Sequence, residues 1–215
     1  MKIDFHVHTN SSLDSSIKPD ELAKKAESLG IIPAITDHNT TESWEKMKST
    51  FIPGEEIRTT AGDLIGLFLT EEIPKHLSFE ESIDKIKGQG GLSYLPHMYD
   101  KTRYGCGDEF ADLIDIIEVF NGRCLDVFNE LAAETARNLD KPGAGGSDSH
   151  FLFEFGRTYT EVPEFDMENP KELLQALGNA RITGRKAPFY ARGTTTLVKM
   201  GRKIGRKVGL GKAIK

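Results

Sequence analysis

The sequence predicts an α/β domain in which short strands and helices alternate along the chain. An extended segment over residues 2–9 is followed by an amphipathic helix from about residue 19 and then by the apolar run 31–36. This strand–helix–strand order implies a right-handed parallel unit. The alternation continues to about residue 177, and 215 residues are enough to bury one sizeable core. We therefore expect a barrel or an open sheet with its helices outside.

The first helix has clear signals at both of its ends. Pro19 suits the first turn, and Gly30 is a residue that commonly ends a helix. Leu22, Ala26 and Leu29 form an apolar stripe at the spacing i, i+4, i+7. We expect a helix that begins near Pro19 and ends before Gly30, with this apolar stripe along one face.

The remaining elements follow from apolar runs and capping signals. Ser78 and Glu81 match a capping box ahead of Phe79, Ile83 and Ile86, which would share one helical face. Short apolar runs between turn residues predict strands, and the segments between them predict helices. Strands are expected at 57–60, 64–69, 92–95, within 113–120, and at 142–146 and 158–162, and helices at 41–49, 125–139 and 170–177.

Composition indicates an ordinary soluble protein with one unusual segment. The net charge is −5, but residues 197–215 carry seven Lys or Arg and no acid, which leaves −12 for the rest of the chain. No apolar run approaches the length of a membrane-spanning helix, and the two cysteines form no CxxC pair. The N-terminus does not resemble a signal peptide, so we expect a cytoplasmic protein with reduced thiols.

Polar side chains gather at or just after the carboxyl ends of the expected strands, where α/β barrels and open sheets place their active sites. Five of the six histidines lie there together with acidic residues. This mixed set of nitrogen and oxygen ligands suits Zn, Mn or Fe, and it is too large for one tetrahedral ion. We expect at least two ions, with Glu56 as the bridging carboxylate. The residues concerned are His6, His8, Asp37, His38, Glu55, Glu56, Asp63, His97, Asp100, Glu118, Asn121, Asp148 and His150.

Several motifs in order along the chain resemble those of the PHP (polymerase and histidinol phosphatase) superfamily of metal-dependent phosphoesterases. They span residues 1 to about 162. The matching segments are His6-Val7-His8-Thr9, Leu13-Asp14-Ser15-Ser16, Thr36-Asp37-His38-Asn39, Gly54-Glu55-Glu56, Pro96-His97-Met98-Tyr99-Asp100 and Gly146-Ser147-Asp148-Ser149-His150.

The resemblance implies a distorted (β/α)7 barrel that holds two or three divalent ions at the carboxyl ends of its strands. It also implies three ligand groups. These are His6, His8, Glu56 and Asp148 for the first ion, Glu56 and His97 with a further residue for the second, and Asp14, His38 and His150 for the third.

Asp63 departs from the family pattern. The family often carries His in a His-x-x-Gly stretch, whereas this chain has Asp63-Leu64-Ile65-Gly66. A carboxylate can still bind metal there, and it makes the second site more suited to Mn or Mg.

Supporting roles are expected for five further residues. Asp37 would orient a ligand or a catalytic water, and Glu118 and Asn121 would hold the metal ligands in place. Arg103 and Arg123 are candidates for phosphate binding, because a guanidinium pairs with phosphate in a bidentate way. A surface arginine is the alternative for each of these two.

The expected activity is hydrolysis of phosphate esters by a hydroxide that bridges metal ions about 3.5–4 Å apart. A small phosphorylated compound is the favoured substrate. The alternatives are a nucleic-acid exonuclease, an amidohydrolase and a non-catalytic metal-binding module. No obligate protein partner is inferred.

The domain is expected to end at residue 192 and to be followed by a basic tail over 193–215. Ile204, Val208 and the surrounding cations give an amphipathic pattern, but Gly201, Gly205 and two later glycines weaken any helix. A solvated tail, binding to nucleic acid, and binding to an anionic membrane surface all remain open.

Overall fold

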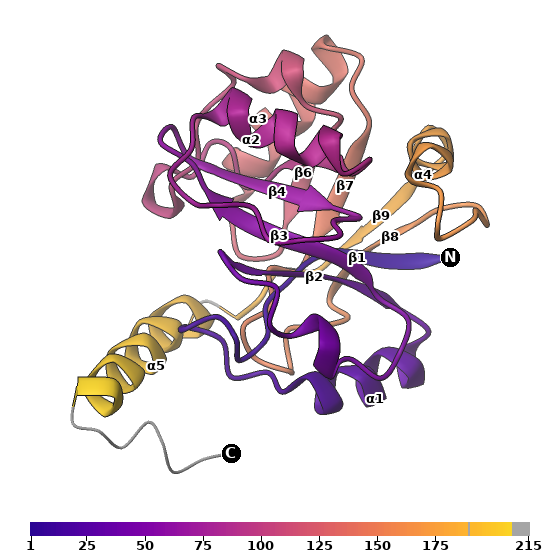
Figure 1. Cartoon of the computed structure of the whole chain (residues 1–215). Coiled ribbons are helices and arrows are strands. Elements are labelled where there is room, and N and C mark those ends of the chain that lie inside the picture. The colour runs from indigo at the N-terminus through magenta and orange to yellow at the C-terminus, as the bar shows by residue number, and fades with distance from the viewer. Residues whose placement is uncertain (189, 208–215) are drawn as a thin grey trace.

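The strands of this chain form one mixed sheet in the order β7-β6-β5-β4-β3-β2-β1-β8-β9. This is seen in a computed structural model that describes residues 1–188 and 190–207 (Figure 1). The strand bounds are β1 (Lys2–Val7), β2 (Ile32–His38), β3 (Ile52–Arg58), β4 (Asp63–Leu67), β5 (Leu92–Leu95), β6 (Ile116–Asn121), β7 (Gly143–Gly146), β8 (Thr158–Glu161) and β9 (Arg181–Gly184).

The sheet curls until its edge strand β7 lies against β1, so it forms a nearly closed barrel. Directly after β7, the amide of Asp148 donates to the carbonyl of His6 at 2.7 Å, and the amide of His8 donates to the carbonyl of Ser149 at 3.0 Å. Gly146 makes the contact possible, because a Cβ there would lie 2.4 Å from the Cβ of His6. The predicted α/β barrel is confirmed. It is distorted because β4 and β8 run antiparallel to their neighbours.

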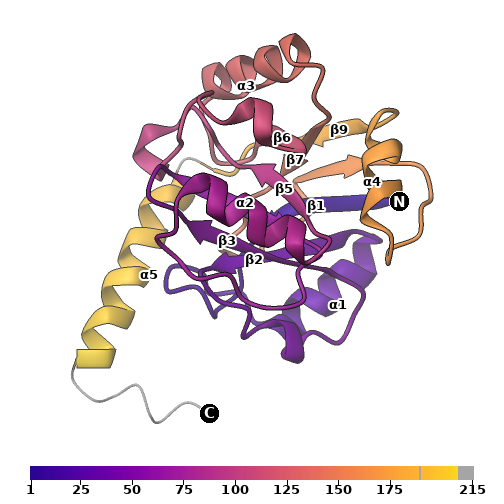
Figure 2. The same cartoon turned by 45° about the horizontal axis from the view of Figure 1, so that its top comes forward.

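The helices lie outside the barrel (Figure 2). They are α1 (Pro19–Leu29), α2 (Phe79–Gly88), α3 (Asp126–Asn138), α4 (Pro170–Leu177) and α5 (Tyr190–Lys207). The predicted start and end of α1 are confirmed, with Gly30 in the left-handed conformation at φ 61°. The capping box of α2 is also formed, since Ser78 and Glu81 exchange side-chain and backbone hydrogen bonds.

Two local predictions were wrong. Residues 41–49 form only a short 3-10 turn at Trp44–Lys46, because Ser43 Oγ donates to Asp37 at 2.6 Å and Trp44 Nε1 donates to the carbonyl of Gly54 at 3.2 Å. These bonds hold the segment against the sheet. The strand expected at 57–60 instead spans Ile52–Arg58, with Pro53 and Gly54 inside it. Proline and glycine usually interrupt strands, so their presence led us to predict a start for this strand that was too late in the sequence.

Strand β9 was not predicted. It is a short strand at the end of the sheet, and its four residues are exposed or only partly buried. It therefore lacks the apolar run that identifies a buried strand. It pairs with β8 along its whole length, which gives the polar segment Arg181–Gly184 its structure.

The basic C-terminal segment contains a long helix despite its glycines. Helix α5 has 18 residues and runs through the domain boundary expected at residue 192. It projects from the barrel beside the loops that follow β1 (Figures 1 and 2). Residues 208–215 lie outside the described part of the chain. Among the described helices, none is long and apolar enough to cross a membrane.

Candidate metal centre

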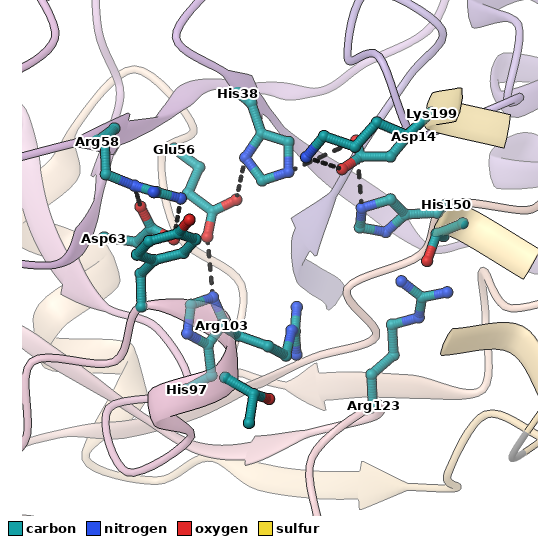
Figure 3. Close-up of a pocket in the computed structure, with 13 residues that line it drawn as sticks. Asp14, His38, Glu56, Arg58, Asp63, His97, Arg103, Arg123, His150 and Lys199 are labelled. Atoms are coloured by element: carbon teal, nitrogen blue, oxygen red, sulfur yellow. Dashed lines mark hydrogen bonds and ion pairs between the residues drawn. The ribbon is translucent and has the colours of Figure 1, made fainter. Parts of the chain in front are cut away.

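Six of the nine predicted ligands line one cavity at the carboxyl ends of the barrel strands (Figure 3); they are Asp14, His38, Glu56, Asp63, His97 and His150. The other three, His6, His8 and Asp148, are buried beside Glu56. The nine side chains come from β1 to β4 and from the loops that follow β1, β5 and β7. The cavity has a volume of about 160 Å³. Its lining residues are Asp14, His38, Glu56, Arg58, Asp63, His97, Thr102, Arg103, Tyr104, Arg123, His150, Thr195 and Lys199.

The four ligands expected for the first ion surround one point. His8 Nε2 lies 3.4 Å from both Glu56 Oε2 and Asp148 Oδ1, and His6 Nε2 lies 3.6 Å and 3.7 Å from the same two oxygens. Two ligands bound about 2.1 Å from a tetrahedral ion lie about 3.4 Å apart. The two ring nitrogens of His6 and His8 lie closer, at 3.0 Å. This spacing suits a single ion between the four side chains.

Glu56 faces two further histidines through its two oxygens. Its Oε1 lies 2.9 Å from His97 Nε2, and its Oε2 lies 2.8 Å from His38 Nδ1. Because the carboxylate also faces His6 and His8, it can serve more than one ion. Glu56 lies near the end of β3 and is the register partner of His38, the last residue of β2. This pairing of the two strands produces the arrangement.

The third expected group, which is Asp14, His38 and His150, also comes together in the structure, with His8 beside it. One ligand nitrogen each from His8, His38 and His150 lie within 4.8 Å of one another. Asp14 Oδ1 lies 3.6 Å from His38 Nε2 and 3.7 Å from His150 Nε2. His150 Nδ1 lies 2.9 Å from the carbonyl of Asp148, to which it can donate a proton, leaving Nε2 free for a metal.

The second expected group is less complete. His6, Glu56 and His97 can form a cluster with ligand atoms within 4.8 Å of one another. Asp63 reaches the cavity, but Arg58 Nε and Nη2 lie 2.5 Å and 3.2 Å from its two oxygens. The guanidinium also lies over the ring of Tyr104 at 3.4 Å. An arginine in this position neutralises Asp63 and opposes a cation there, so the role of Asp63 as a ligand stays a prediction.

Glu118 and Asn121 lie behind the metal ligands, as expected for supporting residues. Glu118 Oε1 lies 3.1 Å from His6 Nδ1, and its Oε2 accepts a bond from the His97 amide at 2.8 Å. Asn121 Nδ2 donates to Glu118 at 2.9 Å and to Asp148 Oδ2 at 3.1 Å. Such contacts fix the ring orientation and tautomer of a metal-binding histidine.

Asp37 is hydrogen-bonded to the loop after β1. Its carboxylate accepts bonds from the hydroxyls of Thr9, Ser12 and Ser43, each at 2.6 Å. Ser12 connects it to two histidines, because the Oγ of Ser12 lies 3.4 Å from His8 Nδ1 and accepts from the amide of His38 at 3.0 Å. The role suggested by these contacts is to hold the loop after β1.

The two arginines expected to bind phosphate have different surroundings. Arg103 forms an ion pair with Asp148, and its Nη1 donates to Asn121 Oδ1 at 3.1 Å. Arg123 is buried, donating from Nε to Glu154 at 3.0 Å and from Nη2 to the carbonyl of Ala191 at 2.8 Å. Arg103 therefore borders the cavity with a guanidinium that a phosphate could engage, whereas Arg123 mainly joins protein segments.

Sequence reasoning missed Glu154 and Lys199. The buried Glu154 carboxylate also accepts bonds from the amides of His150 and Phe151, both at 2.9 Å, so it holds the loop that carries a ligand. Glu154 lies four residues after His150, and this closeness in sequence was the only signal that could have linked it to the site. Lys199 reaches the cavity from α5, and no sequence motif linked that helix to the site.

Two of the expected ligands have unusual backbone conformations. His97 has φ 31° and Asp148 has φ 54°. Positive φ is uncommon for residues other than glycine, and such conformations cluster at functional sites. In this chain they occur where β5 and β7 end and the chain turns to direct a side chain toward the cavity.

Burial and neighbouring carboxylates shift the pKa values of the clustered histidines in opposite directions. Burial lowers the pKa of His8 and His150 well below the ordinary value, so both rings are neutral. Burial acts the same way on His6 and His38, but nearby carboxylates overcome it and raise both pKa values to about 9. Burial also opposes ionisation of Glu56, yet His38 and His6 hold its pKa well below the usual range.

Two buried carboxylate oxygens support metal binding directly. Asp148 Oδ1 and Asp14 Oδ1 find no hydrogen-bond donor among the residues that the structure describes. Buried polar atoms are normally paired, so these two deserve an explanation. Both face histidine nitrogens at 3.4–3.7 Å, a spacing that leaves room for an ion between them. The donor set therefore fits divalent metal ions.

Comparison with known proteins gives a consistent result. The family model described as the PHP domain matches residues 4–141, and that described as PHP-associated matches residues 127–182. An uncharacterised protein of Methanocaldococcus jannaschii is 41% identical over 184 residues, which cover 80% of this chain and 75% of that protein.

Two solved structures share the fold. A two-domain protein from Bacteroides vulgatus, containing a predicted PHP-like metal-dependent phosphoesterase, matches with a TM-score of 0.68 and 21% identity over 86% of this chain. The match spans 65% of the Bacteroides protein. A lesion-specific endonuclease from Pyrococcus furiosus matches with a TM-score of 0.58 and 17% identity, covering 84% of this chain and 57% of the endonuclease. The matched residues include most of the cavity described above, and the chain belongs to the PHP domain family.

Proposed function

We propose that this protein is a metal-dependent hydrolase of phosphate esters. The observation that carries the proposal is the position of Glu56, whose oxygens face His97 at 2.9 Å and His38 at 2.8 Å while His6 and His8 lie beside it. A shared carboxylate among neighbouring ligand groups is the arrangement that a multinuclear site needs. When bound, the ions would lower the pKa of a bridging water and polarise a phosphoryl oxygen.

The protein's own residues would hold the ions and the substrate. The clusters around His8 and Glu56 would bind two or three divalent ions, with Mn, Zn or Fe suiting their mixed nitrogen and oxygen donors. Arg103 borders the cavity and can pair with phosphoryl oxygens. Glu118 would keep His6 oriented, because it accepts a bond from the ring nitrogen that faces away from the cluster.

The size and charge of the cavity favour a small phosphorylated compound over a nucleic acid. A cavity of about 160 Å³ suits a phosphate group with a small substituent better than a nucleic-acid strand, and Arg103 and Lys199 contribute cations to its lining. A nucleic-acid end remains the second candidate, because the basic helix α5 adjoins the cavity.

The test is to determine the bound metals of the purified protein and to assay a phosphomonoester, a phosphodiester and a nucleic acid with Mn. We expect turnover of the monoester that falls at least 100-fold in His8→Ala and Asp148→Asn, because each removes a ligand of the first ion. Lys171→Ala, which changes an exposed lysine on α4, should behave like the wild type.

Other results would point elsewhere. Metal binding without turnover of any phosphoester would contradict the proposal and favour a non-catalytic module, while hydrolysis of an amide alone would favour an amidohydrolase. Turnover that survives both ligand substitutions would show that the site is assigned wrongly.

A further inference from the structure

Helix α5 is attached to the loops that carry the metal ligands. Arg202 Nη1 donates to the carbonyls of Asn10 and Ser12, at 3.2 Å and 2.8 Å, in the loop after β1. At the start of the helix, Arg123 donates to the carbonyl of Ala191 at 2.8 Å. The helix lies after residue 182, where the matched family models end. It therefore adds residues to the cavity that family membership does not account for.

Lys199 is the α5 cation that reaches the ligand cluster. Its Nζ lies 3.5 Å from Asp14 Oδ2, while the other oxygen of Asp14 faces His38 and His150 (Figure 3). An ammonium carries three donors, so the pair with Asp14 leaves it able to bind a second acceptor.

The cavity continues past Lys199 into a larger cleft of about 450 Å³. Four residues line both the cavity and the cleft and so mark the passage between them: Asp14, His38, Arg58 and Lys199. The cleft is lined further by Ser11, Leu13, Asn39, Thr40, Glu42, Lys75 and His76. A molecule whose reacting end fills the cavity would extend through this passage, directly beside the Lys199 ammonium.

A purely structural role explains Lys199 less well. Arg202 and Arg123 already attach α5 to the barrel through three hydrogen bonds to carbonyls. The Lys199 side chain is 47% exposed, and an exposed ion pair contributes roughly 0–1 kcal/mol to stability. The lysine is thus unnecessary for anchoring the helix, and its position beside the cavity calls for another explanation.

We propose that Lys199 is a substrate-positioning residue whose ammonium binds the outward-facing oxygens of the substrate phosphate, while the organic part of the substrate lies in the adjoining cleft. The inference rests on the proposed function, since it concerns how the same site holds its phosphate. It gives α5 a role in binding the phosphate of the substrate.

The experiment measures binding of inorganic phosphate to the Mn-loaded, full-length protein by titration calorimetry. We expect Lys199→Ala to weaken phosphate binding about tenfold, because a hydrogen bond to a charged group is lost. Lys199→Arg should retain most of the affinity, and Lys171→Ala, the matched loss of one surface charge, should retain all of it. In steady-state assays Lys199→Ala should raise KM about tenfold with kcat changed less than threefold.

The outcomes separate the two proposals. Wild-type affinity for phosphate in both Lys199→Ala and Lys199→Gln would overturn the role of Lys199 and leave the proposed function intact. Loss of bound Mn in Lys199→Ala would also overturn it, because the effect would then act through Asp14. If the Mn-loaded wild type turns over no phosphomonoester, the proposed function fails and this inference fails with it, whereas turnover without measurable binding of phosphate would overturn the role of Lys199 alone. Thermal melting of each variant checks that it is folded.

Discussion

At the scale of single residues, the site depends on where buried carboxylates lie relative to histidines. Adjacent residues in β3 show this clearly, because Glu55 and Glu56 point to opposite faces of the strand. Glu56 faces the histidines and is held ionised by them. Glu55 accepts one bond from the amide of Ile73 at 2.8 Å, and its Oε1 has no donor among the described residues. Burial is the main cause that raises the pKa of Glu55 to about 8.

Glu55 should make the protein less stable as the pH rises. Between pH 4.5 and about 8 the unfolded chain releases this proton while the folded chain keeps it. The free energy of unfolding should therefore fall by up to about 1.4 kcal/mol per pH unit across this window and level off above it. Glu55→Gln should remove this dependence, which urea denaturation at pH 5, 6, 7 and 8 would measure. Equal pH slopes in wild type and variant would show that Glu55 ionises normally.

At the scale of elements, the loops after the strands are held by side chains that sequence motifs did not reveal. Arg123 was predicted to bind phosphate, yet it lies buried between Glu154 and the first residues of α5. Glu154 in turn holds the His150 loop. One guanidinium thus links the loop after β6, the loop after β7 and the C-terminal helix.

Arg123→Met should destabilise the protein by about 2–4 kcal/mol, because it leaves the Glu154 carboxylate buried without its partner. Urea denaturation would measure the loss, and the double variant with Glu154→Gln should lose less than the sum of the single variants. Hydrogen exchange should also accelerate in the first turn of α5. A weakened affinity for phosphate at unchanged stability would instead support the predicted phosphate contact.

At the scale of the whole molecule, the expected metal ligands come from strands that are distant in sequence. The first group connects β1 and β3 to the loop after β7, across the closing edge of the barrel. Without ions, buried carboxylates and partly protonated histidines must balance one another there. Bound ions should therefore stabilise the closed barrel as well as support catalysis.

Removing metal with a chelator should lower the melting temperature, and Mn should restore it. At a metal concentration of 100 times Kd, binding contributes about 2.7 kcal/mol per ion. Differential scanning calorimetry of the chelated and Mn-loaded protein would measure the change. Asp148→Asn is the control, since it should lose most of the response to metal. An identical melting temperature in both states of the wild type would contradict the expected ligand set.

The sequence alone determined the alternation of elements, the ends of α1 and the order of the histidine motifs, because these depend on local spacing and capping. It could not reveal the Arg58–Asp63 pair, the burial of Arg123 or the approach of α5 to the cavity, because each joins side chains through contacts that no local pattern encodes. The glycines of α5 even argued against a helix. Tertiary contacts outweighed that propensity, and they bring Lys199 beside Asp14.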